Sequence, residues 1–206
     1  MMHVPASSDS SAMKLKTIMP IQCFPSNVLR TERLILSRAR RNDASDLLRY
    51  YSENRHHLES WNPSRSENFY TVVEIEKRLC EMETQMQEGN ALHILIRRSE
   101  GAALVGECSF TNIVRGPFQA CHLGFSVAAD EEGNGLMYEA LSKAIEFTFD
   151  VCGFHRIMAN YKPENSRSAR LLERLGFEVE GRARAYLKIN GQWADHILTS
   201  RISDLD

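Results

Sequence analysis

The fold is decided by residues 123–147, LGFSVAADEEGNGLMYEALSKAIEF. An apolar strand ends there in the turn Gly133-Asn134-Gly135, and apolar side chains then recur at helical spacing from Met137 onward. This order places a row of backbone N–H groups at the start of a helix, where the helix dipole adds partial positive charge. Such a helix start binds anions, most often phosphate, and glycines without Cβ let a pyrophosphate approach the backbone closely.

Two common phosphate sites are disfavoured at this turn. No Lys-Ser/Thr pair follows the glycines, which disfavours a P-loop. The preceding strands form a meander, and no acidic residue lies about twenty residues further on in a βαβ unit, which disfavours a Rossmann site. A tight turn without any ligand stays open as the alternative, since the G-x-G pattern by itself is weak.

Upstream of the turn, the sequence predicts a strand, two amphipathic helices and an antiparallel meander. The helices begin near Ala44 and near Tyr70, where apolar residues take up helical spacing. Apolar runs bounded by turns indicate strands. These strands cover residues 31–40, 91–97, 103–110 and 118–127.

Downstream of the turn, a strand, a short helix and a hairpin are predicted. HRIMANY (155–161) has the composition of a strand, and Asn165-Ser166 can cap the helix that Gly176 closes. The last hairpin turns about Asn190-Gly191, a favoured type I′ pair. The order is therefore β-α-α-β-β-β-α-β-α-β-β, without an internal repeat or a linker after about residue 30.

The composition is that of one globular domain. A chain of 206 residues suits a single domain, and 43% hydrophobic with 25% charged residues is ordinary. The net charge of -2 disfavours a chain-wide grip on nucleic acid, although local basic contact stays open. We interpret residues 1–27 as a flexible tail and 28–206 as the domain, with Met13 as an alternative start.

Cysteine usage and hydropathy indicate a cytoplasmic protein. The cysteines are odd in number and widely spaced, which disfavours a disulfide framework or a zinc site, so we expect reduced thiols and no metal. No apolar run resembles a signal peptide or a membrane span, so no membrane association is expected. The cysteines are Cys23, Cys80, Cys108, Cys121 and Cys152.

Residues 123–147 resemble the acetyl-CoA-binding motif of the GNAT superfamily of N-acetyltransferases. HRIMANYKPENSRSARLLERLGF (155–177) is similar to the strand and helix that follow that motif. The chain more closely resembles the RimJ/RimL branch, the ribosomal-protein N-terminal acetyltransferases, over about residues 28–200. The segments that carry this likeness are, in order, TERLILSR, SENRHHLESW, NIVRGPF, CHLGFSV, HRIMANY, NSRSARLLERLGF and INGQWADHIL.

The resemblance implies an α/β (α+β) fold with a mixed, mostly antiparallel sheet flanked by helices. The strands at 119–128 and 155–161 would splay into a V, with Gly124 as a natural bulge or kink. The resemblance also implies acetyl-CoA as the acetyl donor. Its pantetheine arm would pair with the splayed strand, and a backbone N–H of Phe125, Ser126 or Val127 would meet the thioester carbonyl.

Further cofactor contacts are implied by the same likeness. Asn165 would reach the cofactor from the last core helix, and Ser168 would lie near the sulfur. The amides expected to bind the pyrophosphate are those of Gly133, Asn134, Gly135, Leu136, Met137 and Tyr138.

The sequence departs from the superfamily pattern at two positions. The arginine or glutamine often found three residues before the first glycine is Asp130, followed by Glu131 and Glu132. Acids beside a pyrophosphate are unfavourable, so backbone amides would have to carry the binding. The tyrosine that often serves as general acid is Leu172. Ser168 is our substitute for protonating the thiolate, and an ordinary N3 residue of the helix is the equal alternative.

The acceptor implied by the branch is a protein N-terminal amine. Its pKa lies near 7.7–8.0, against about 10.4 for lysine, so a modest general base suffices. The candidate bases are Glu107, His122 and Glu53. His122 has an ordinary pKa suited to neutral pH but could instead be a partly exposed strand residue, and Glu53 could instead line the entrance or cap the turn at His56 and His57.

The expected reaction is acetylation of the N-terminal α-amine, on alanine, of a ribosomal protein. The expected partner is a small-subunit ribosomal protein or the ribosome itself. Expected acceptor contacts are Glu53, Trp61, Arg115 and Tyr186, of which the last three could equally be packing. Two alternatives stay open: acetylation of a small amine or peptide antibiotic, and a non-enzymatic role in ribosome assembly or RNA binding, for which scattered arginines leave room. The chain could be a monomer or a dimer.

Overall fold

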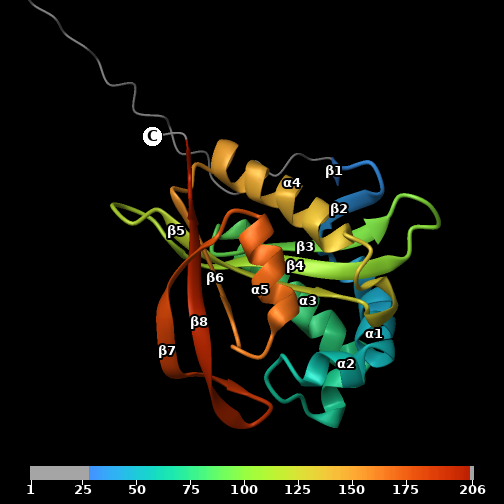
Figure 1. Ribbon diagram of the computed structural model, residues 1–206. Coiled ribbons are helices and arrows are strands. Elements are labelled where there is room, and N and C mark those ends of the chain that lie inside the picture. Colours follow the sequence, from blue (N-terminus) through green and yellow to red (C-terminus); the bar gives the residue numbers. More distant parts are fainter. Residues whose placement is uncertain (1–27, 205–206) are drawn as a thin grey trace, which may run out of the picture.

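The computed structural model describes residues 28–204, and the predicted tail at 1–27 lies outside the described residues. The described part forms one sheet with strand order β1-β2-β3-β4-β5-β6-β8-β7. Helix α4 covers one face of the sheet, and α1, α2 and α3 lie at the other (Figure 1). Every neighbouring pair is antiparallel except β5 and β6, which run parallel.

The elements follow the predicted order, with a short additional strand, β1, and with a short helix, α2, between the two predicted amphipathic helices. The strands are β1 (Leu29–Arg30), β2 (Leu34–Arg38), β3 (Leu92–Arg98), β4 (Leu104–Val114), β5 (Ala120–Val127), β6 (Arg156–Tyr161), β7 (Glu178–Ile189) and β8 (Gln192–Ile202). The helices are α1 (Ala44–Glu53), α2 (Arg55–Glu59), α3 (Val72–Gln87), α4 (Leu136–Asp150) and α5 (Ser166–Arg174). Single 3-10 turns cover Arg41–Asp43, Glu67–Tyr70 and Ala129–Glu131.

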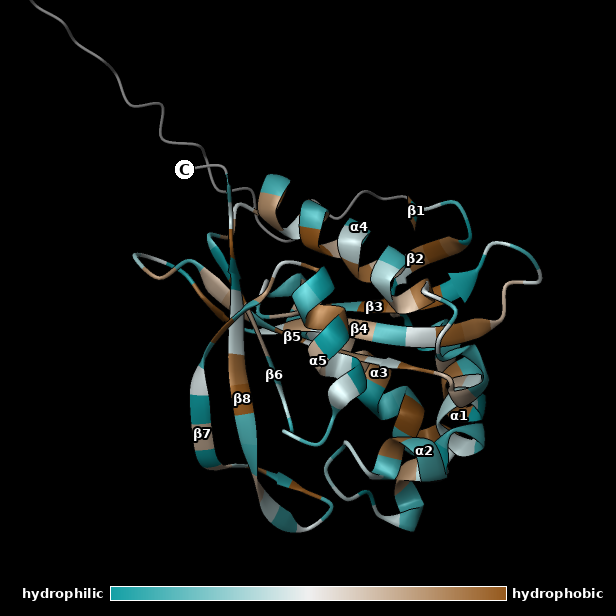
Figure 2. Ribbon diagram, in the orientation of Figure 1, coloured by the Kyte–Doolittle hydropathy of each residue, from teal (hydrophilic) through white to brown (hydrophobic). Residues whose placement is uncertain are grey.

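Helix α4 is held by an apolar stripe against the sheet. Leu136, Ala140, Leu141 and Ala144 are almost fully buried because they recur at the helical period on one side. Figure 2 shows the hydrophobic residues of α4 turned toward the strands and the polar ones turned away. This packing fixes the N-terminus of α4 next to the end of β5.

The V-shaped splay is present between β5 and β6. The two strands pair only at Ala120–Arg156, Cys121–Ile157 and His122–Met158. Beyond His122, the residues of β5 pair with β4 alone, while β6 stays paired with β8 as far as Tyr161. Beyond His122, β5 therefore stays paired with β4 and β6 stays paired with β8, while β5 and β6 separate from each other.

The bulge predicted at Gly124 is wrong. Gly124 pairs with Ser109 inside an unbroken register, because β5 follows β4 without interruption from Val127 to His122. The irregularity lies instead between Thr111 and Val114 on β4, where Asn112 has a φ of 49°. The splay needs no bulge in β5, since the strands part by keeping different partners.

The predicted turn at the end of the β7–β8 hairpin is confirmed. Asn190 and Gly191 have φ values of 44° and 77°, the two positive values that a type I′ turn requires. The N–H of Asn190 donates to the carbonyl oxygen of Asn62 at 3.1 Å. The hairpin tip is therefore tied to the segment between α2 and α3.

Candidate active site

The first half of the site is the turn before α4. Gly133 and Gly135 adopt φ values of 77° and 75°, in the left-handed region that favours glycine. Within the described part of the chain, the backbone N–H groups of residues 133–138 donate to no acceptor. Three of them belong to the first turn of α4, where helical N–H groups have no internal partner. These free donors, with space where a Cβ would otherwise stand, fit the pyrophosphate of coenzyme A.

The residues after Gly135 contribute backbone rather than side chains to this half. Leu136 and Met137 are buried in the core. Tyr138 packs under the guanidinium of Arg174, whose Cζ lies 4.4 Å from the ring centroid. The side-chain amide of Asn134 donates to Glu131 Oε2 at 3.4 Å, so this donor is already engaged.

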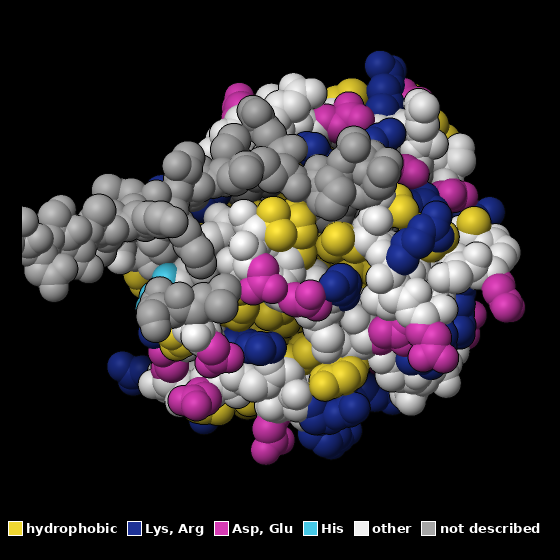
Figure 3. All heavy atoms as spheres, turned by 90° about the horizontal axis from the view of Figure 1, so that it is seen from above, with side chains coloured by type: hydrophobic (Ala, Val, Ile, Leu, Met, Phe, Trp, Pro, Cys, Tyr) yellow, Lys and Arg dark blue, Asp and Glu magenta, His cyan; other side chains and the backbone are white. Residues whose placement is uncertain are grey.

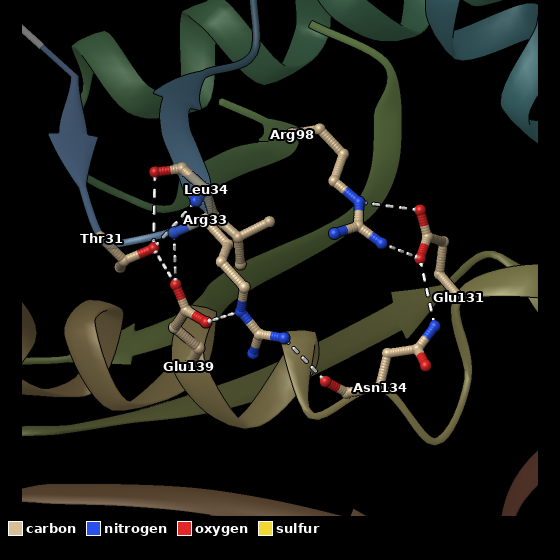
Figure 4. A network of polar contacts seen from close by, with 7 residues as sticks. All are labelled: Thr31, Arg33, Leu34, Arg98, Glu131, Asn134 and Glu139. Atoms are coloured by element: carbon tan, nitrogen blue, oxygen red, sulfur yellow. Dashed lines mark hydrogen bonds and ion pairs between the residues drawn. The ribbon is translucent and has the colours of Figure 1, made fainter. Parts of the chain in front are cut away.

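The acidic run beside this turn is compensated by arginines from distant parts of the chain. Figure 4 shows Arg98 donating to Glu131 Oε1 at 3.0 Å and to Oε2 at 2.5 Å. The hydrogen bonds from Arg98 hold the pKa of Glu131 below its usual range. Glu132 forms an ion pair with Arg167 of α5 and lies 3.6 Å from His57 Nε2. These ion pairs therefore offset the negative charge that was expected to oppose a pyrophosphate at this turn. Sequence spacing does not reveal them.

Arg33 braces the same turn from the other side. Its Nε donates to Glu139 Oε2 at 2.7 Å and its Nη1 donates to the carbonyl oxygen of Asn134 at 3.0 Å (Figure 4). Thr31 donates to Glu139 Oε1 at 2.5 Å. Partial burial raises the pKa of Glu139, but the hydrogen bonds from Thr31 and Arg33 outweigh it and leave that pKa lowered.

We expect Arg98→Gln to weaken acetyl-CoA binding about two- to fivefold, because Glu131 then faces the phosphates without a counter-charge. The loss should shrink at high salt, which screens the exposed carboxylate. Isothermal titration at low and high NaCl measures it. Arg156→Gln is the matched control, since Arg156 pairs with Glu180 at 2.6 Å elsewhere in the sheet. A loss that does not depend on salt would contradict the electrostatic reason.

The start of α5 lies beside the same turn, because Arg167 of α5 forms an ion pair with Glu132. Asn165 is the N-cap of α5, with its Oδ1 accepting the N–H of Ser168 at 3.0 Å. Ser168 is half-buried at N3, and its hydroxyl has no hydrogen-bond partner among residues 28–204. Leu172, at the position of the family's tyrosine, is 1% exposed and belongs to the core.

Asn165 is expected to bind the cofactor as well as cap the helix, and two substitutions separate these roles. Asn165→Ala should cost about 1 kcal/mol of stability through the lost cap. Asn165→Ser keeps a capping oxygen but removes the amide, so stability should be nearly unchanged. Both should weaken acetyl-CoA binding in a titration. An unchanged affinity in Asn165→Ser would remove Asn165 from the site.

The second half of the site is a pocket of about 540 Å³ on the sheet face that carries α1 and α3. The strand register aligns its floor, with Glu107 opposite Ser126 and Ser109 opposite Gly124. The wall residues above this floor come from α3 and from the segment at 62–66. The pocket therefore includes Gly124, Phe125 and Ser126, the part of β5 that has left β6.

Two tyrosines of α1 reach this floor. Tyr51 donates its hydroxyl to Glu107 Oε1 at 2.8 Å and Oε2 at 2.9 Å. The hydroxyl oxygens of Tyr50 and Ser126 lie 2.8 Å apart. Burial, and then the charge of Glu107, raise the pKa of both tyrosines well above the usual value. Tyr51 therefore stays a donor, and Glu107 keeps acceptor capacity for a further group in the pocket.

The structure does not gather the three catalytic candidates at one point. Glu107 lies in the pocket, and Ser168 lies on α5. His122 lies at the vertex of the splay, opposite Thr111, and is four residues or roughly 13 Å along β5 from Ser126. Burial lowers the pKa of His122, and its Nδ1 has no partner within the described range. Glu107 is thus the candidate base that the pocket contains.

The predicted acceptor contacts occupy different places. Glu53 is exposed at the end of α1. Trp61, with Lys162 Nζ 5.4 Å from its ring centroid, precedes the pocket residue Asn62. Tyr186 pairs with the amide of Asn160 at 3.2 Å. Arg115 lies at the far end of β4 from Glu107, over the ring of Phe154 at 4.2 Å.

Sequence reasoning missed Asn54. This buried side chain accepts the N–H of Ala129 at 2.8 Å and donates to the carbonyl oxygen of Tyr50 at 2.9 Å. It thereby ties the end of α1 to the start of the turn that precedes α4. The segment SENRHHLESW contains Asn54, but nothing in its spacing distinguishes Asn54 from its neighbours.

The remaining features of the described part concern its cysteines, its metal-binding side chains and its surface charge. Cys80, Cys108, Cys121 and Cys152 are thiols outside any disulfide, and burial raises the pKa of Cys121 to about 12. Between residues 28 and 204, no group of three or more His, Cys, Asp or Glu is arranged to hold a metal, and no helix has the length and apolar character to cross a bilayer. Lys and Arg are interspersed with Asp and Glu on the face over α4 (Figure 3).

Comparison with known proteins gives the family. The model of the acetyltransferase (GNAT) domain matches residues 33–178. The chain is 43% identical over 172 residues, 84% of the chain and 89% of the relative, to the [ribosomal protein uS5]-alanine N-acetyltransferase of Escherichia coli K12.

Two solved structures extend this likeness. Ribosomal-protein-S5-alanine acetyltransferase from Vibrio fischeri is 37% identical with a TM-score of 0.82, covering 86% of this chain and 97% of that one. RimJ of Mycobacterium smegmatis, in complex with CoA-disulfide, is 26% identical with a TM-score of 0.83, covering 90% of each chain. With the GNAT sheet, its splay and the amide row before α4 all in place, the chain belongs to the GNAT acetyltransferase family.

Proposed function

We propose that this acetyltransferase modifies the N-terminal α-amino group of a small-subunit ribosomal protein, with alanine as the acceptor residue. The observation that carries the proposal is the position of Glu107. It lies in a pocket that shares Phe125 and Ser126 with the splayed strand, so amine and acetyl donor can meet across β5. The identity to a uS5-alanine N-acetyltransferase supports the choice of acceptor. A ribosomal acceptor implies a cytoplasmic enzyme.

Acetyl-CoA supplies the acetyl group as a thioester. The amides of residues 133–138 hold its pyrophosphate, and a backbone N–H of Phe125, Ser126 or Val127 stabilises the thioester oxygen as negative charge develops there. Glu107 accepts the proton of the attacking amine, and Tyr51 holds the Glu107 carboxylate in place. The C–N bond forms as the C–S bond of the thioester breaks, and the Ser168 hydroxyl donates a proton to the leaving thiolate and recovers one from solvent.

On chemical grounds, an α-amine needs less help from a general base than a lysine side chain does. At neutral pH about a tenth of α-amines are already unprotonated, against far fewer lysine amines. A single carboxylate is therefore sufficient to accept the proton of the attacking amine.

The test uses small ribosomal subunits whose proteins have free N-termini. They are incubated with the enzyme and acetyl-CoA, and each ribosomal protein is weighed intact. We expect one protein to gain a single acetyl group at its N-terminal alanine. If no ribosomal protein gains mass, while a small amine is acetylated under the same conditions, the proposed acceptor is wrong.

A further inference from the structure

The acceptor pocket holds two arginines that its own residues leave unpaired. Arg65, from the segment between α2 and α3, and Arg78, from α3, both line the pocket with Glu107. Neither guanidinium has a hydrogen bond or an ion pair with any residue in the range 28–204. The Nε of Arg78 is shielded from solvent and still has no partner, which is an unfavourable state for a charged donor.

Aromatic rings, rather than acids, hold these two side chains. The Cζ of Arg65 lies 4.3 Å from the ring centroid of Tyr51 and 4.0 Å from that of Phe69. The Cζ of Arg78 lies 6.0 Å and 5.9 Å from the same two centroids. Arg65 is close enough to stack on the rings, which fixes the plane of its guanidinium while its N–H edge stays available for a planar acceptor. Arg78 lies at the outer limit of such a contact.

Three arginines near the pocket or near the turn before α4 show the contrast, because each of them is paired with an acid. Arg55 also lies over a ring, 4.5 Å from the centroid of Tyr70, but it is paired with Glu59 at 3.0 Å and Glu67 at 2.5 Å. Arg98 and Arg167 are paired with the acidic run. Two unpaired positive charges beside the same pair of rings repel each other, and an anion between them would remove that repulsion.

The surrounding charges agree with an anion at this end of the pocket. His93 lines the pocket near Arg78, and burial together with that positive charge lowers the pKa of His93 to about 4, so it adds no charge at neutral pH. Of the acids that line the pocket, Glu107 accepts from Tyr51 and is paired with neither arginine, and Glu74 has no ion pair with a described residue. The pocket thus has a base at the floor and free cations on the wall.

We propose that Arg65 and Arg78 form a carboxylate-binding subsite of the acceptor pocket, which selects acceptors that carry an acidic side chain within the first few residues behind the reacting amine. The proposal rests on the proposed function, since it takes Glu107 as the place of the amine. An arginine fork matches a carboxylate in bidentate geometry, which gives selectivity as well as affinity. The carboxylate can belong to Asp or Glu of a peptide, or to a small amino acid.

The test compares acceptor peptides that begin with alanine and differ only in charge. Three peptides carry one Glu at the second, third or fourth residue, one carries Gln throughout, and a free amino acid serves as the small acceptor. We expect the wild-type enzyme to prefer one acidic peptide over the neutral peptide about tenfold in kcat/KM, through KM. Arg65→Gln and Arg78→Gln should each lose this preference, and the control Arg55→Gln should keep it.

A charge swap checks that the effect is direct. Arg78→Glu should prefer a peptide with Lys at the selected position, which a merely misfolded variant could not do. Equal rates for acidic and neutral peptides in the wild-type enzyme would overturn the subsite and leave the proposed function standing. If only the free amino acid is acetylated, and its rate depends on both arginines, the subsite stands and the peptide acceptor fails.

Discussion

Gly135→Val abolishes acetyl-CoA binding, with an expected loss of affinity of at least about 100-fold. Gly135 precedes α4 with a φ of 75°, a conformation that a β-branched residue adopts only with strain. The substitution therefore moves the amides of the turn as well as adding atoms where a pyrophosphate must approach. Isothermal titration with coenzyme A measures the affinity, and circular dichroism shows whether the fold is retained.

The chain offers a closely matched control for this variant. Gly89 has the same φ of 75° and no heavy atom within 4 Å of an added Cβ, and it follows α3 rather than opening α4. Gly89→Val should lower stability by about 1–2 kcal/mol and leave coenzyme A affinity unchanged. Wild-type affinity in Gly135→Val would show that the turn before α4 is not the phosphate site.

Glu107→Gln lowers kcat/KM by about 100-fold at neutral pH, the second large effect that we expect. Glutamine keeps the shape of the side chain and an acceptor for Tyr51, but it cannot take a proton from the amine. The loss should shrink above about pH 8.5, where the α-amine is already neutral. Steady-state rates on an alanine-terminal peptide between pH 6.5 and 9 (about one unit either side of the amine pKa) measure the trend.

Tyr51→Phe separates proton transfer from positioning. It keeps the ring under Arg65 and removes only the hydrogen bond to Glu107. We expect a smaller loss, about tenfold, with the pH trend of the wild-type enzyme. A Glu107→Gln enzyme that is fully active at pH 7 would exclude Glu107 as the base and leave His122 as a candidate base.

Local signals predicted most of the fold correctly. Asn190-Gly191 specifies a two-residue turn by its own backbone preferences, and the apolar stripe of α4 specifies its buried side. The glycine turn before α4 was predictable for the same reason, since only glycine readily takes the φ of Gly135. The bulge expected at Gly124 failed because strand pairing depends on both neighbouring strands, which a single segment does not encode.

The site was less predictable because its contacts join distant segments. Tyr51 is buried in α1, yet its hydroxyl reaches Glu107 on β4, a contact that the sequence of α1 alone does not encode. The acidic run looked unfavourable for a phosphate site because Arg98 and Arg167, which compensate it, lie outside the motif. Arg65 and Arg78 carry no sequence signal at all, since an unpaired arginine is recognisable only once its surroundings are known.

The most direct test of the account is the position of the acetyl group on a peptide that offers both amines. A peptide with a free N-terminal alanine and an internal lysine is incubated with the enzyme and acetyl-CoA at neutral pH, and tandem mass spectrometry locates the modification. We predict that the acetyl group appears on the alanine α-amine, and that Glu107→Gln suppresses its transfer. Acetylation of the lysine side chain in preference to the N-terminus would contradict the central claim.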